Sequence, residues 1–241
     1  MSINSDEQQN AALSWTKAVT KNKEIVAENS NRLIPKGSKL NLKNPPRIKR
    51  KLSAWKGRTD RQAFWLKHNL IKKTLPGEAG EIFDELKMAR AEILGSKEYD
   101  GAKLNIQNFS IDVTKNLADD EIQLSTLINL WFKNLNGFKL DKDQKRLIDQ
   151  IPNINSRNSQ KISEDMISSI EDEESFLKSS LSLLNALKLL EQEKSEENEE
   201  KEKFDEQSDE NEESLSDNLN EIESDEEPSN CLLYTSPSPR D

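Results

Sequence analysis

The chain has almost no residues from which to build a nucleophilic or metal-binding centre. Its 241 residues include one cysteine, Cys231, and one histidine, His68. A disulfide needs two cysteines, and zinc sites use several cysteine or histidine ligands. With His68 alone, neither a histidine-rich metal site nor a serine-histidine-acid triad is assembled, so a hydrogen-bonded structural role is its simpler interpretation. We therefore expect no catalytic, cofactor-binding or metal-binding residues in this chain.

Glycine and long apolar runs are also scarce. The seven glycines contain no Gly-x-x-x-x-Gly-Lys-Ser/Thr pattern, which excludes a P-loop for ATP. No run approaches the roughly 18 apolar residues of a membrane span, and the polar start from Met1 to Asn10 is no secretion signal, so we expect a cytoplasmic protein. Hydrophobic residues make up 33% and aromatic residues 5% of the chain, which predicts that part of it is disordered.

The charge of the chain is divided unequally. Residues 191–227 hold nineteen Asp or Glu and three Lys, a net charge of −16, whereas residues 1–190 carry +6. The acidic segment has too few apolar residues to offset the entropy of ordering it, so we expect a disordered acidic tether over 191–230. The alternative is a solubility segment without a specific partner. Within it, Glu212, Ser214 and Ser216 resemble a metal-adhesion motif but have the wrong acid, and we interpret them as a chance match.

The last eleven residues, 231–241 (CLLYTSPSPRD), have an unusual sequence. They correspond codon by codon to the translated end of a common sequencing-library adapter. We therefore expect that Cys231 is not native and that the gene continues past Asn230.

The most strongly patterned stretch is residues 76–105, PGEAGEIFDELKMARAEILGSKEYDGAKLN. Pro76 is tolerated in a first helical turn, Glu78 and Glu81 suit a positive helix start, and Gly95 falls where a glycine commonly ends a helix. Apolar residues at helical spacing form one stripe toward the core, with Arg90 at its edge. The stripe consists of Ala79, Ile82, Phe83, Leu86, Ala89, Arg90 and Ile93. The pattern predicts a core helix.

This stretch closely resembles the N-terminal region of the CobT subunit of the aerobic, cobalamin-pathway cobaltochelatase. The resemblance is carried by Ile82, Phe83, Asp84, Ala89, Arg90, Glu92, Gly95, Gly101 and Asn105. Upstream, Gly57, Asp60 and His68 are similar to the family's glycine-x-x-aspartate turn and the histidine that follows it. One departure is Lys87, where the family usually has a glutamate.

The resemblance implies a role without chemistry of its own. In that family CobT is the non-ATPase partner of the AAA+ subunit CobS, whose ATP hydrolysis supports cobalt insertion into hydrogenobyrinic acid a,c-diamide by the large subunit CobN. The family complex uses ATP, Mg and cobalt. This chain would be a non-catalytic subunit of the metal-inserting ligase that acts in complex assembly, with the family's A-domain beyond Asn230. The residues that we expect to contact partners are Arg47, Lys49, Arg50, Lys51, Arg90 and Glu92.

Patterning predicts further elements around this helix. We expect helices near residues 7–19, 58–72, 119–135 and 141–151, and short strands at 24–27 and around Leu40 and Leu42. Asp119 and Asp120 are N-cap candidates, Gly137 is a stop signal, and Asp141 with Gln144 resembles a capping box. After a polar linker at 153–160, one long helix is expected over 163–193, bent or interrupted at 171–174. Its apolar face either packs against the preceding helices, the simpler interpretation, or binds a partner.

A basic segment leaves the function open. Residues 36–73 hold thirteen Lys or Arg against one acid, Asp60, and include Trp55 and Trp65. Such a segment is either a solvated face with its tryptophans in the core, a docking face for an acidic partner, or a phosphate-binding surface with stacking indoles. The competing function is therefore a nucleic-acid or polyanion-binding module with an acidic autoinhibitory tail. A third is a structural coiled-coil protein that self-associates through residues 177–187.

The predicted fold class is mainly α, an N-terminal helical domain with a possible small two-stranded element, followed by a disordered acidic tail. The predicted organisation is a helical domain over 1–152, a linker and long helix over 153–190, an acidic tether over 191–230 and the adapter-like residues 231–241.

Overall fold

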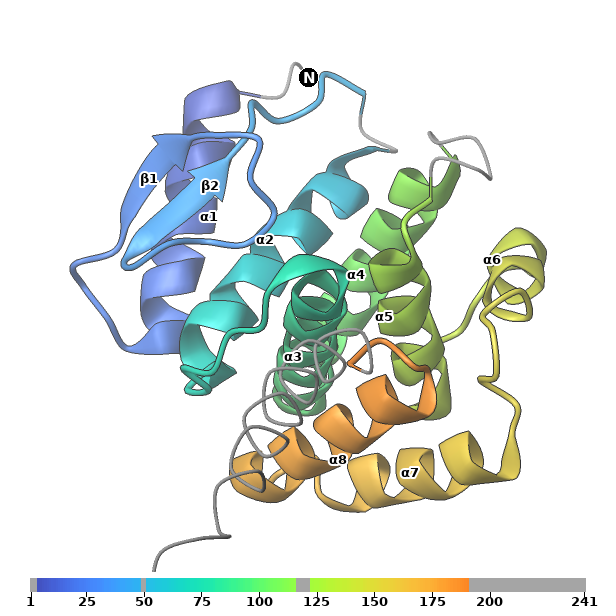
Figure 1. Ribbon diagram of the computed structural model, residues 1–241. Coiled ribbons are helices and arrows are strands. Elements are labelled where there is room, and N and C mark those ends of the chain that lie inside the picture. Colours follow the sequence, from blue (N-terminus) through green and yellow to red (C-terminus); the bar gives the residue numbers. More distant parts are fainter. Residues whose placement is uncertain (1–3, 49–50, 116–121, 191–241) are drawn as a thin grey trace, which may run out of the picture. The chain divides into compact units, whose positions relative to one another are not determined.

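Helices make up most of the part of the chain that the structure describes, residues 4–48, 51–115 and 122–190 of a computed structural model (Figure 1). The elements in chain order are α1 (Ser5–Thr20), β1 (Val26–Asn29), β2 (Lys39–Leu42), α2 (Leu52–His68), α3 (Gly77–Glu98), α4 (Asp100–Lys115), α5 (Leu124–Leu135), α6 (Lys142–Ile148), α7 (Arg157–Ser168) and α8 (Glu173–Ala186). The predicted fold class, mainly α with a small two-stranded element, is confirmed. The predicted tether at 191–230 and the residues 231–241 lie outside the described residues.

The two strands form a parallel pair that is attached to α2 by a side chain. Val26 lies opposite Lys39, and Asn29 lies opposite Leu42. Gln62 of α2 reaches the backbone of β2: its Nε2 donates to the Asn41 carbonyl at 2.9 Å, and its Oε1 accepts from the Asn41 amide at 2.9 Å. One buried side-chain amide therefore pairs with β2 as a third strand would, and both backbone groups of Asn41 are satisfied beside the helix.

Helix α3 lies at the centre of the fold and packs against α2, α4, α5 and α8. Every member of the predicted stripe is buried. Met88, Ala91 and Ser96, which lie off that stripe, are buried as well. The prediction of a single buried face was too narrow, because neighbouring helices enclose α3 on several sides.

The predicted helix end at Gly95 is wrong. Helix α3 continues to Glu98, and a side chain at position 95 would place its Cβ 2.2 Å from Cγ of Phe64. Glycine is therefore required by the close approach of the Phe64 ring from α2. Tyr99 then breaks the helical path, with φ −135° and ψ 88°, and α4 begins at once at Asp100. Helix α4 was not expected as a separate helix.

The next two helices follow their predicted signals in part. Helix α5 begins after Gln123, later than expected; Asp119 and Asp120 lie outside the described residues. Gly137 follows the helix with φ +78°, a left-handed conformation that suits glycine. The predicted capping box of α6 is confirmed, with the Gln144 amide donating to Asp141 Oδ1 at 2.9 Å.

Two helices, α7 and α8, replace the single long helix that was expected. Ser156 caps α7 within the predicted polar linker, so this helix begins earlier, at Arg157. The expected interruption is real, because Asp172 caps a new helix by accepting from the Glu174 amide at 3.0 Å. Helices α7 and α8 pack against each other, and α8 contacts α3. The apolar face of this region therefore packs inside the chain, in line with the simpler of the two interpretations.

A buried network of four charged side chains joins α2, α3 and α5. Arg61 donates to both carboxylate oxygens of Glu85 and lies 3.4 Å from Glu92, and Lys133 lies 2.8 Å from Glu92. Burial on its own lowers the pKa of Arg61, but Glu85 and Glu92 more than offset it and the net shift is upward. For Lys133 burial dominates and lowers its pKa, with Glu92 opposing. Two acids and two bases balance here, which makes the burial tolerable.

Candidate functional site

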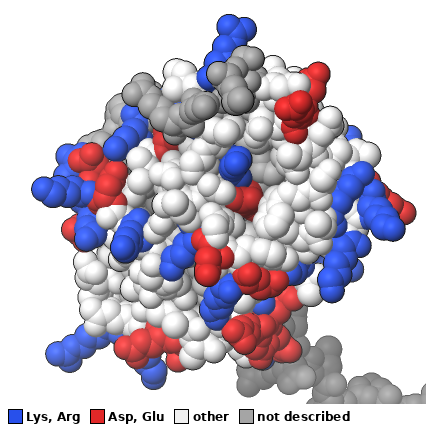
Figure 2. All heavy atoms as spheres, turned by 180° about the vertical axis from the view of Figure 1, so that it is seen from behind, with Lys and Arg blue, Asp and Glu red and all other residues white. Residues whose placement is uncertain are grey.

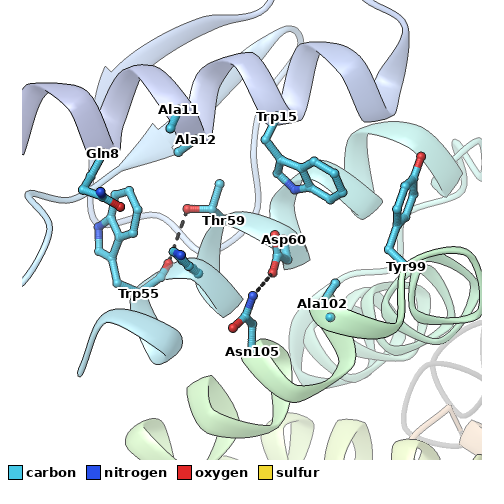
Figure 3. A pocket seen from close by; sticks show the side chains of 12 residues that line it. Gln8, Ala11, Ala12, Trp15, Trp55, Thr59, Asp60, Tyr99, Ala102 and Asn105 are labelled. Atoms are coloured by element: carbon cyan, nitrogen blue, oxygen red, sulfur yellow. Dashed lines mark hydrogen bonds between the residues drawn. The ribbon is translucent and has the colours of Figure 1, made fainter. Parts of the chain in front are cut away.

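A cavity of about 590 Å³ lies between α1, α2 and the start of α4, and we name it the Asp60 pocket (Figure 3). Its lining includes three aromatic side chains and one buried carboxylate. It is lined by Gln8, Ala11, Ala12, Trp15, Trp55, Lys56, Thr59, Asp60, Tyr99, Gly101, Ala102 and Asn105. Its size is in the range typical of ligand or side-chain binding sites.

Asp60 is the buried acid of the pocket, with 5% of its surface exposed. Asn105 Nδ2 donates a hydrogen bond to Asp60 Oδ2 at 2.9 Å. Burial raises the pKa of Asp60 to about 6, against the opposing effects of Asn105, Trp15 and Lys56. The carboxylate is therefore mostly ionised at neutral pH and becomes protonated just below it.

Asn105 is held in one orientation by the α2–α4 contact. A side chain at Gly57 would place its Cβ 2.0 Å from the Asn105 carbonyl oxygen, so the two backbones approach as only glycine permits. Ser53 Oγ donates to Asn105 Oδ1 at 2.8 Å, and Asn108 Nδ2 donates to Ser53 Oγ at 3.0 Å. With its oxygen occupied, the amide of Asn105 presents its nitrogen to Asp60.

The aromatic wall is anchored on the central helix. Trp15 of α1 meets Tyr99 edge to face, with ring centroids 4.9 Å apart, and Tyr99 stacks on Phe64 at 6.0 Å. Phe64 in turn rests on Gly95 of α3. Figure 3 shows the Trp15 ring next to Asp60 and the Tyr99 ring beyond it, on the side away from Trp55. Aromatic faces next to a buried carboxylate suit a cationic or amide donor group.

Some of the pocket residues lie far apart in the sequence but belong to the same family pattern. Asp60, Gly101 and Asn105 line it, and Gly57 supports it from α2. Ile82, Phe83 and Ala89, from the same resemblance, lie in the core instead. In the sequence, Gly57, Asp60, Gly101 and Asn105 are linked only by the family pattern, and the α2–α4 contact brings them together in space.

Two pocket residues were missed as functional candidates. Trp15, within the first predicted helix, and Tyr99 were not named as functional candidates. The available signal was their residue type, because tryptophan and tyrosine are enriched in recognition sites.

Arg90, expected at a partner surface, is 5% exposed and acts inside the chain. Its guanidinium donates to the carbonyls of Ile170 at 2.8 Å, His68 at 3.1 Å and Glu171 at 3.3 Å. Burial lowers its pKa, with Glu173 and Asp172 opposing. The residue joins the end of α2 to the α7–α8 connection.

Glu92 has no exposed surface, since it is the central acid of the buried charge network. Lys87, the departure from the family pattern, is also buried, and its Nζ pairs with Asp84 at 2.6 Å. In this fold Arg90 and Glu92 do not reach the surface. The predicted partner contacts that remain are Arg47, Lys49, Arg50 and Lys51.

The basic residues divide into an exposed group and a buried group. Arg47 and Lys51 are exposed, whereas Lys49 and Arg50 lie outside the described residues. Arg58 and Arg61 are buried, and Trp55 and Trp65 are each 8% exposed. On the face shown in Figure 2, acidic and basic side chains are intermixed, and both also occur near its middle among uncharged residues. The buried indoles are poorly placed for base stacking, which weakens the nucleic-acid alternative.

The contacts of His68 are with residues that hold the helices together. Its ring lies 3.3 Å from Glu98, and its backbone carbonyl accepts from Arg90. Burial lowers its pKa, against the effect of Glu98.

Within the described residues, no group of three or more His, Cys, Asp or Glu is arranged to hold a metal ion. None of the described helices is long and apolar enough to cross a membrane.

The geometry defines a helical unit with a recessed aromatic and acidic pocket. The model of the family "Cobalamin biosynthesis protein CobT" matches residues 4–231, and the chain belongs to this family. Neither the comparison with curated proteins nor that with solved structures gives a match. The family makes the chain a cobaltochelatase-type subunit of cobalamin biosynthesis and a member of a multi-subunit complex.

Proposed function

We propose that this chain is a non-catalytic assembly subunit of an ATP-dependent cobaltochelatase that inserts cobalt into hydrogenobyrinic acid a,c-diamide. Its folded region binds the AAA+ ATPase subunit and, with the rest of the protein, links it to the large chelating subunit. ATP, Mg and cobalt act on those partners in this scheme.

The observation that carries the proposal is the convergence of Asp60, Gly101 and Asn105 on one pocket. These residues belong to the pattern shared with the family, and at least Gly101 is not needed to fill the core, since it is exposed and a Cβ there would meet nothing within 4 Å. Asp60 and Asn105 contribute their polar side chains to the pocket. Polar pattern residues that line a pocket instead of filling the apolar core are candidates for binding.

The pocket offers a partner two kinds of contact. Trp15 and Tyr99 supply aromatic area at a low cost in side-chain entropy, and Asp60 supplies a buried acceptor. A lysine or arginine side chain of the AAA+ subunit matches both features, because its cation pairs with the carboxylate and its stem lies along the rings. We propose this as the docking contact.

The core beneath the pocket supports a docking role. The buried charge network ties α2, α3 and α5 together, and Arg90 ties α2 to the α7–α8 connection. A force applied by a partner at α2 would therefore act on the whole helical unit rather than on one helix.

Capture of the purified AAA+ subunit by the full chain, with and without a non-hydrolysable ATP analogue, tests the proposal. Trp15→Ala removes the aromatic wall, and we expect retention to fall about tenfold or more. Leu70→Ala is the matched control, because Leu70 is 72% exposed and lies outside the pocket. Circular dichroism on both variants confirms that the fold is retained.

If the Trp15→Ala variant and the wild-type chain retain the AAA+ subunit equally, the docking site does not lie in the pocket. Absence of any complex between the wild-type chain and the AAA+ subunit, with or without nucleotide, would refute the assembly role itself.

A further inference from the structure

A second cavity, about 460 Å³, lies between the segment that leads into α2, α2 itself and α4. We name it the Arg58 pocket. Its basic members are Lys43, Lys51 and Arg58, and its apolar walls include Leu33 and Phe109. It shares only Trp55 with the Asp60 pocket, so an inference about it does not rest on the proposed docking of the AAA+ subunit.

Arg58 is the unusual member of this pocket. It is 7% exposed, and its terminal nitrogen donates to the carbonyls of Ser30 at 3.1 Å and Arg32 at 3.0 Å. Its Nε has no hydrogen-bond partner. Among the described residues no carboxylate forms an ion pair with it, whereas buried Arg61 in the next turn has two. Buried charges are normally paired, and within the described part of the chain Arg58 has no such anion.

The rim adds positive charge around this guanidinium. Lys43 and Lys51 are exposed and line the same cavity, and neither forms an ion pair with a described residue. Asp112 also lines the cavity, and it is engaged in an interaction of its own. Among the described lining residues three cations stand against one acid, so this part of the pocket is net positive, and no described carboxylate pairs with Arg58, its most desolvated cation.

The shape and the walls select the kind of anion. The cavity is much larger than a single small ion requires, and apolar side chains such as Leu33, Phe109 and Val113 form part of its lining. A fitting ligand therefore has apolar surface next to its negative group. An acidic side chain in a peptide, flanked by apolar residues, has both features, whereas a free anion has only the charge.

We propose that the Arg58 pocket binds a glutamate or aspartate side chain of a peptide segment of a partner protein. The carboxylate pairs with the Arg58 guanidinium, the lysines of the rim contact neighbouring acids, and the flanking apolar residues lie against the wall of Leu33 and Phe109. A charge-assisted pair in a desolvated pocket fixes the register of the peptide more strongly than surface charges do.

Fluorescence anisotropy with the full chain tests this site. The probe is a fluorescein-labelled synthetic peptide of alternating glutamate and leucine, and its matched control replaces every glutamate with glutamine. We expect the double variant Lys43→Glu/Lys51→Glu to raise the Kd of the acidic peptide about tenfold or more. Arg58→Gln is expected to raise it as well, and a circular dichroism melt shows whether that variant is folded.

The control variant is Lys145→Glu/Lys161→Glu, which makes the same charge change at exposed positions on α6 and α7, outside the cavity. Binding of the acidic peptide that survives in this control, fails in the pocket variant and is absent for the glutamine peptide supports the proposal.

Three results would overturn the proposal. One is an equal loss of peptide binding in both double variants, which would mean that only long-range charge attraction holds the peptide. Another is displacement of the peptide by inorganic phosphate with an equal Kd, which means a free-anion site. The third is no binding of the acidic peptide to the wild-type chain.

Discussion

The guanidinium of Arg90 donates from its Nε to the backbone carbonyl of Ile170, 80 residues further along the chain, at 2.8 Å. The same side chain reaches the carbonyl of His68 at the end of α2. One side chain of the central helix thus satisfies carbonyls at two helix ends that would otherwise be unpaired in the interior. Its place in the family pattern is explained by this structural role.

Replacement of Arg90 tests that role. Arg90→Ala leaves the carbonyls of Ile170 and His68 without their donor, so we expect the free energy of unfolding to fall by about 2 to 4 kcal/mol. Arg157→Ala is the control, because Arg157 is exposed at the start of α7. Urea unfolding followed by circular dichroism measures both. Equal stability of the two variants would contradict the role.

The central helix makes a second prediction through Phe83. This ring has no exposed surface, and its neighbours Ile82 and Leu86 have none either. Phe83→Ala leaves a cavity that the packed helices cannot close, and we expect a loss of about 3 to 5 kcal/mol in a thermal or urea melt. No loss would mean that the ring is not in the core.

Two glycines of the family pattern are expected to respond oppositely to alanine. Gly95→Ala forces Cβ against the Phe64 ring and should cost about 1 to 3 kcal/mol. Gly101→Ala, in the first turn of α4, meets open space and should change stability by less than about 1 kcal/mol, if anything upward. Paired melts of the two variants measure the difference. A larger loss for Gly101→Ala than for Gly95→Ala would contradict the packing.

The buried acid of the Asp60 pocket predicts a pH dependence. Its pKa is about 6 in the fold and 3.8 for an ordinary aspartate, so the folded state holds this proton more tightly than the unfolded chain. The resulting stabilisation is full below about pH 4 and is lost as the pH rises through 6. In Asp60→Asn this loss is removed, and the variant should gain about 1 to 3 kcal/mol relative to wild type between about pH 4 and pH 7.

Urea melts of the wild-type chain and the Asp60→Asn variant at both ends of this pH range test the prediction, because subtraction cancels the other titrating groups. A stability difference that does not change with pH would show that Asp60 has an ordinary pKa. Asn105→Ala is a useful companion, since it removes the hydrogen bond that favours the ionised form.

Local signals in the sequence were sufficient where neighbouring residues decide the outcome. The capping box at Asp141 and Gln144 forms as expected, and Asp172 within the acidic stretch 171–174 does cap a new helix. A side chain next to a helix end acts on the nearest amides whatever the rest of the fold does. The same holds for the apolar stripe of α3, which had to be buried somewhere.

Features that depend on contacts between distant segments were predicted wrongly or not at all. Gly95 has the typical position of a helix-ending glycine, but its actual role is to admit Phe64 from another helix. Arg90 and Glu92 suggest a charged surface, but each has its partners on other helices. The Asp60 pocket exists only because Gly57 lets α2 and α4 approach closely enough to place Asn105 beside Asp60.

By itself, the sequence determined that the folded part is mainly helical, where several of its helices begin and end, and which family it belongs to, because helix caps, apolar periodicity and motif residues are local properties. Only the tertiary structure decided which charged residues are interior and which of the motif residues share a pocket. Those outcomes depend on which helices meet and how closely, and a contact between residues 45 or 80 positions apart leaves no local trace in the chain.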